Sequence, residues 1–158
     1  MTTGSLALAW QTMDGVTRTD LMAAVEARLE GVTKANGYRT NLGEWLRTWS
    51  ADAPNWDELP VLRVSDPSAE VAQALYGGLQ HTVTIPVELL LPGGANPSDL
   101  RDCAADLLSA VGADPLWSGL ATGSAVTAVA LAPGERDRVS AGVTVSLTVT
   151  YETAPWSL

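Results

Sequence analysis

A strict alternation of apolar and polar residues near the C-terminal end limits the possible folds more than any other part of the sequence. From residue 139 to residue 153 every second side chain is apolar or aromatic, and those between them are mostly small and polar. Successive side chains of a strand point to opposite faces, so the pattern predicts one long strand with a single buried face. The apolar set is Val139, Ala141, Val143, Val145, Leu147, Val149 and Tyr151.

A second alternating run covers residues 79–91 and also predicts a strand with one buried face. Pro86 lies inside this run and has no N–H group, so the strand should form an edge or a bulge there. Strands with one apolar face are typical of antiparallel sheets whose apolar side is covered by other elements. The residues on the predicted buried face are Leu79, His81, Val83, Ile85, Val87, Leu89 and Leu91.

Two segments have the period of an amphipathic helix. In residues 19–32 the apolar positions are Leu21, Val25, Leu29 and Val32, and in residues 97–111 they are Leu100, Cys103, Ala104, Leu107, Leu108 and Val111. Thr17 or Thr19 is expected to cap the first helix, and Gly31 or Gly37 to end it. For the second helix the expected cap is Ser98 and the expected end is Gly112.

The remaining segments have weaker patterns. Residues 38–50 are rich in aromatic residues and threonine, which favours a strand, interrupted at Gly43. Residues 59–65 are predicted as a short strand, and residues 66–75 as a helical turn or a loop. Residues 124–131 are predicted to form a hairpin with the long C-terminal strand.

Together these elements predict an α+β fold. We expect a mainly antiparallel β-sheet with two α-helices packed on one face and a β-hairpin at the C-terminal end. Residues 1–16 precede the first helix and are interpreted as an N-terminal extension or arm, and residues 17–158 as a single domain.

Composition excludes several classes of function. The chain of 158 residues has a formal net charge of −9, which disfavours sequence-specific nucleic-acid binding. It contains one cysteine, Cys103, and one histidine, His81, and each is expected in the core. No phosphate-binding, dinucleotide, serine-hydrolase or zinc-protease motif is present. We therefore expect no catalytic residue, no cofactor, no metal site and no membrane segment.

Two groups of residues are candidates for contacts with partners. Asp99, Asp102 and Asp106 repeat at helical spacing, which indicates a solvated acidic face or, in an assembly, a face turned to a channel or partner. Trp56 and Trp156 occur in loop and tail contexts, and tryptophan is enriched at interfaces. The long C-terminal strand is also a candidate edge for pairing with another subunit.

The order of these motifs resembles a known family. The sequence has the helix MAAVEARLEGV, then GYRTNLGEWL, ELPVLRVSD and HTVTIPVELLL, a second helix, WSGLA, and a final VSLTVTYET. Over about residues 20–153 this pattern resembles the tail terminator (tail completion) proteins of long-tailed phages and prophages. The resemblance does not include the N-terminal extension.

The resemblance implies a structural protein that forms a hexameric ring, caps the tail tube, ends tail polymerisation and provides the head-joining surface. Its implied partners are further copies of itself, the tail tube protein and head–tail connector or neck proteins, and DNA can pass through the ring. It implies synthesis in the host bacterial cytoplasm and a place at the head-proximal end of the virion tail. In such a ring we expect the hairpin loop with Glu135, Arg136 and Arg138 to contact acids of the next subunit. Another neck or tail component, or a non-viral domain that binds a small ligand or a protein, is the alternative.

Overall fold

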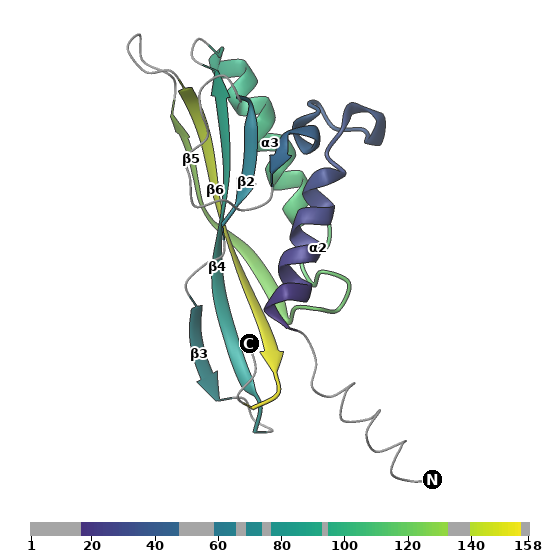
Figure 1. Ribbon diagram of the computed structural model, residues 1–158, viewed down its shortest axis with the longest axis vertical. Helices are drawn as coiled ribbons and strands as arrows, with labels where there is room; N and C mark the ends of the chain where they lie inside the picture. The colour runs from purple at the N-terminus through teal and green to yellow at the C-terminus, as the bar shows by residue number, and fades with distance from the viewer. Residues whose placement is uncertain are drawn as a thin grey trace.

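The computed structural model describes residues 17–47, 59–65, 69–73, 77–92, 95–132 and 140–155. Within these ranges, six strands form one sheet and two α-helices lie against one of its faces (Figure 1). The helices are α2 (Arg18–Glu30) and α3 (Pro97–Gly112), with the short 3-10 helices η1 (Lys34–Asn36) and η2 (Leu42–Trp45). The strands are β1 (Leu46–Arg47), β2 (Val61–Val64), β3 (Ala69–Gln73), β4 (Leu79–Pro92), β5 (Gly123–Ala132) and β6 (Ser140–Thr153).

The sheet has the order β1-β2-β4-β6-β5, and β3 pairs with the other half of β4. β1 and β2 are parallel, while the other pairs are antiparallel. The predicted α+β class, with both helices on one face and a C-terminal hairpin formed by β5 and β6, is confirmed. Residues 1–16, predicted as an extension, lie outside the described residues.

The two alternating runs form the centre of the sheet. β4 and β6 pair along their whole length, from Leu79 opposite Thr153 to Pro92 opposite Ser140. Among the described residues, the predicted apolar faces are buried under the helices, apart from Leu79, which is partly exposed. Most Thr and Ser side chains lie on the opposite face, but Thr153 is on the buried face and is 4% exposed. Val139 lies outside the described residues. β6 is therefore a central strand between β4 and β5, and the prediction that it forms an edge is wrong. The edge strand of this hairpin is β5.

Pro86 is accommodated by a gap between two strands. The Ser65 N–H donates to the Pro86 carbonyl at 3.2 Å, so the Pro86 nitrogen also faces the β2 side. On that side of β4, β2 pairs with residues 87–90 and β3 pairs with residues 79–83, so neither strand pairs with Pro86. Among the described strands, the missing N–H thus costs no ladder hydrogen bond, and the predicted local edge at Pro86 is confirmed for this part of the chain.

Helix α2 begins and ends where its sequence predicts. Thr17 is the N-cap: the Asp20 N–H donates to its Oγ1 at 3.2 Å, and the Asp20 carboxylate accepts from the Thr17 N–H. Gly31 is the C-cap, and Leu21, Val25 and Leu29 are buried.

Helix α3 differs from its prediction in two details. Its N-cap residue is Asn96 and Pro97 begins the helix, so Ser98 is not the cap. Leu108, which was placed on the apolar stripe, is 39% exposed, and Ala110 is buried instead. The helix ends at Gly112, as predicted.

Of the strand predicted for residues 38–50, the described part forms a strand only at residues 46–47. The described part contains η2 and the two-residue β1, and residues 48–50 lie outside the described residues. Gly43 explains the difference: its N–H donates to Val32 O at 2.9 Å, and a Cβ there would lie 2.5 Å from the carbonyl oxygens of Leu29 and Glu30. This close approach to the end of α2 fixes a turn where aromatic composition favours a strand.

Residues 66–75 were predicted as a turn or loop, and this is wrong for the described part, because Ala69–Gln73 form β3. The strand is mostly exposed and has little apolar pattern of its own. It pairs with the half of β4 that β2 leaves free, so the pairing comes from the neighbouring strand.

Candidate functional site

The acidic residues of α3 do not lie on one solvated face. Asp99 is exposed, and Asp102 forms an ion pair with Arg39, with 3.2 Å between its Oδ1 and Arg39 Nη1. Asp106 is only 3% exposed, so the predicted solvated face is wrong at this position. The contact of Asp99 and Asp102 with a partner stays a prediction.

The buried Asp106 carboxylate holds the segment after η1 against α3. Its Oδ1 accepts from the Arg39 N–H at 3.1 Å, and its Oδ2 accepts from the Thr40 N–H at 2.7 Å and the Thr40 hydroxyl at 2.6 Å. These are charge-assisted bonds that satisfy two backbone donors outside any helix or strand. Asp106 is therefore a structural residue that connects elements far apart in the sequence.

A surface cleft of about 670 Å³ lies beside this contact. Its wall combines the ion-paired Arg39 and Asp102 with Lys34, Asp99 and the side of Trp45. Mixed charges and one aromatic side chain make it unlike the mostly apolar pockets that bury drug-sized ligands. The complete lining is Lys34, Arg39, Thr40, Asn41, Trp45, Pro60, Leu91, Pro92, Ala95, Asp99, Asp102 and Cys103.

The two reactive residue types that occur once are both in the core, as predicted. Burial first, and then the nearby carboxylates led by Asp106, raise the pKa of the Cys103 thiol to about 11. A thiol with such a pKa is a poor nucleophile at neutral pH. His81 is 2% exposed, stacks on Tyr151 with ring centroids 4.9 Å apart, and places Nε2 2.9 Å from Thr153 Oγ1.

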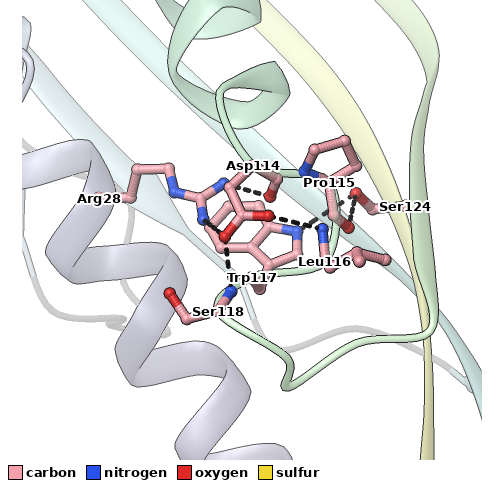
Figure 2. A network of polar contacts seen from close by, with 7 residues as sticks. All are labelled: Arg28, Asp114, Pro115, Leu116, Trp117, Ser118 and Ser124. Carbon is pink, nitrogen blue, oxygen red and sulfur yellow. Dashed lines mark hydrogen bonds and ion pairs between the residues drawn. The ribbon is translucent and has the colours of Figure 1, made fainter.

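A third cluster, which the sequence analysis did not predict, joins α2 to the loop before β5 (Figure 2). The Arg28 guanidinium lies over the ring of Trp117, 3.5 Å from its centroid, and donates to the Asp114 carbonyl at 2.9 Å. Trp117 is fully buried, and its indole N–H donates to Ser124 Oγ at 3.3 Å. The cation–π contact and the hydrogen bonds fix α2 against the start of β5.

The loop in this cluster has an uncommon backbone. Trp117 and Ser118 have φ values of 52° and 58°, in the left-handed region, and Gly119 follows with a φ of 87°. The Asp114 carboxylate accepts from the N–H groups of Ser118 at 2.7 Å and Leu116 at 3.1 Å, and these bonds lower the pKa of Asp114. No local sequence signal places a tryptophan in this conformation; only the neighbouring Gly119 marks a turn.

The other predicted contact residues are not placed. Glu135, Arg136, Arg138, Trp56 and Trp156 lie outside the described residues. Within the described ranges, no group of three or more His, Cys, Asp or Glu side chains is arranged to hold a metal ion. No helix among the described residues is long and apolar enough to span a membrane.

Comparison with known proteins gives a match at the level of structure. Neither a scan of protein-family models nor a search of curated proteins finds a match for the sequence. Among solved structures, the fold is similar to that of a chain from the virion of a native gene transfer agent (GTA) particle, with a TM-score of 0.52 and 11% identity. The similarity covers 84% of this chain and 94% of that chain. At this identity, the match shows a shared fold.

Proposed function

We propose that this protein is a structural subunit of a phage-like virion, and specifically a tail terminator that forms a ring on the end of the tail tube. The observation that carries the virion assignment is the likeness to a GTA virion chain over 94% of that chain. Fold alone does not determine function, so the finer assignment depends on the sequence resemblance.

The described chemistry supports a structural role over a catalytic one. The Cys103 thiol is buried with a raised pKa, and His81 is enclosed between Thr153 and Tyr151. Within the described residues, the polar side chains of Asp106 and Arg28 hold elements of the fold together. A structural role needs no cofactor, because it depends only on surfaces that bind other subunits.

The net charge of −9 also suits a ring through which DNA passes, because an acidic lumen does not retain the phosphate backbone. The partners in this proposal are further copies of the chain, the tail tube protein and the neck proteins of the head. A closed ring is built from head-to-tail contacts, in which two different surfaces of each subunit meet. The cations of the hairpin loop, Arg136 and Arg138, and the exposed acids of α3 are our candidate pair.

The test is native mass by light scattering, with electron micrographs, on the protein alone and mixed with purified tail tubes. We expect a ring of about six subunits, alone or at tube ends, and no tube growth past a capped end. The double variant Arg136→Glu/Arg138→Glu should lose the ring. The control Arg47→Glu, which reverses the charge of an exposed arginine outside α3, should keep it. A protein that stays monomeric and leaves tube ends uncapped would refute the proposal.

Two alternatives have different expected results. Another neck component would bind the portal side of the head and not cap tubes. A small-ligand domain would be a monomer and would use the cleft at Trp45, so a ligand would raise its melting temperature, and Trp45→Ala would abolish that effect.

A further inference from the structure

The outer edge of β5 has the properties of a strand-docking site. β5 is a ten-residue edge strand, and among the described residues it pairs only with β6. Natural edge strands are usually protected by charged side chains, prolines or short length. The sequence GSAVTAVALA has no charge and no proline, and its one irregularity is a bulge between Val126 and Ala128. In contrast, the edge strand β3 has five residues and carries Glu70.

The side chains of β5 also leave an apolar surface incomplete. Val129 and Leu131 pair with Val145 and Val143 of β6, which are buried on the helix-covered face. Val129 and Leu131 themselves are 40% and 41% exposed, because nothing described lies beside them at the edge. On the opposite face β5 presents the small side chains of Ala128 and Ala130. A strand that added here would place large apolar residues on one face and small ones on the other.

The N-terminal segment of the chain has this pattern. Residues 5–11 read SLALAWQ, in which Leu6, Leu8 and Trp10 alternate with small residues, and the first charged residue is Asp14. Such alternation is typical of a strand with one buried face. An uncharged strand also meets this uncharged edge without the repulsion expected between two copies that each carry a charge of −9.

The described structure brings the start of α2 to the correct end of β5. The Arg18 Nε–H donates to the Tyr151 hydroxyl at 3.2 Å, and the preceding residue of β6, Thr150, pairs with Gly123 at the start of β5. In Figure 1 the first turn of α2 lies beside that end of β5. A position outside β5 is two strand spacings from β6, about 10 Å, and residues 12–16 can span up to about 17 Å. The segment then runs opposite to β5, which gives antiparallel pairing.

We propose that residues 5–11 of the same chain add to the outer edge of β5 as an antiparallel strand. Leu6, Leu8 and Trp10 lie on the helix-covered face, where β5 presents Val126, Val129 and Leu131, and Ala7 and Ala9 lie on the face of Ala128 and Ala130. The segment thereby closes the one long uncharged edge of the described sheet. This inference does not depend on the proposed function.

The test is residue-resolved amide hydrogen exchange on the full chain, measured by NMR. We expect the β5 amides that point away from β6 to be protected, and to exchange at least about tenfold faster after deletion of residues 1–12. Leu8→Asp should have the same effect as the deletion, whereas the control Thr2→Asp, outside the segment, should not. The amides of β6 that bond to β4 should be unchanged in all variants, which shows that the fold is intact.

A mixing experiment distinguishes the occupants of the edge. Isotope-labelled chains that lack residues 1–12 are mixed with excess unlabelled full-length protein. Our proposal predicts that the labelled β5 amides remain unprotected. Recovered protection would assign the edge to a segment of a second copy and overturn the intramolecular pairing. Equal exchange in the full-length and deleted chains would overturn the proposal altogether.

Discussion

Replacement of Asp106 by alanine should destabilise the protein strongly, although helical spacing alone places this residue with two exposed acids. The side chain accepts two backbone N–H groups and one hydroxyl, at 2.6 to 3.1 Å, and is 3% exposed. A hydrogen bond to a charged group contributes about 1.5–3 kcal/mol, and a buried donor left without a partner costs about 1–3 kcal/mol. Because the donors are only partly buried, we take about 1 kcal/mol, the lower limit, for each of the three lost bonds and expect a total loss of about 3 kcal/mol.

Asp102→Ala is the matched control, since Asp102 lies one turn earlier on α3 and contacts the same residue, Arg39. That contact is a surface ion pair with 67% and 44% exposed side chains, so its loss should cost less than about 1 kcal/mol. Asp106→Asn should lie between the two, because its amide retains one acceptor oxygen but turns an N–H group toward a donor. The assay is urea unfolding followed by tryptophan fluorescence. Equal free energies of unfolding for Asp106→Ala and Asp102→Ala would refute the reasoning.

Three further predictions follow from single contacts. Gly43→Ala should lower the free energy of unfolding by more than about 2 kcal/mol, measured in urea, because the new Cβ would lie 2.5 Å from two carbonyl oxygens of α2; Gly112→Ala, where a Cβ meets nothing within 4 Å, is the control. Trp117→Leu should cost about 3 kcal/mol, since it removes a fully buried ring, its bond to Ser124 and the contact with Arg28; an unchanged melting temperature would contradict this. Cys103 should react with a thiol reagent at pH 8 at least about a hundredfold more slowly in the folded than in the unfolded chain. Because its pKa rises from 9.0 to about 11 on folding, the associated stability is fully present below pH 9 and is lost as the pH rises toward 11, and Cys103→Ala should remove that part of the pH dependence.

The sequence was most informative where one element's own pattern determines its structure. The alternation in β4 and β6 predicted the central pair, and apolar spacing with Thr17 and Gly31 predicted α2 from its first residue to its cap. These patterns depend only on residues that are close in the sequence, so they can be read from one sequence.

The predictions that failed concern contacts between distant segments. Asp106 has the spacing of a solvated acid, and its partners Arg39 and Thr40 lie more than 60 residues away along the chain. Residues 38–45 have the composition of a strand, yet the approach of Gly43 to the end of α2 goes with bends and the short 3-10 helix η2 there. The left-handed conformation of Trp117 likewise depends on Arg28 of α2. Nothing near these residues in the sequence indicates the partner that decides their structure.

The placement of the hairpin bears on how a ring could close. β6 begins at Ser140, which pairs with Pro92 at the end of β4, and α3 begins soon after, at Pro97. The ends of the hairpin loop, and the exposed Asp99 in the first turn of α3, therefore lie at the same end of the sheet. Rotation about a ring axis leaves every residue at its own height, so surfaces that join neighbouring subunits must lie at similar heights in one subunit. The loop ends and Asp99 meet this condition when the ring axis runs along the strands, which is why we pair the loop cations with the α3 acids in the proposed ring.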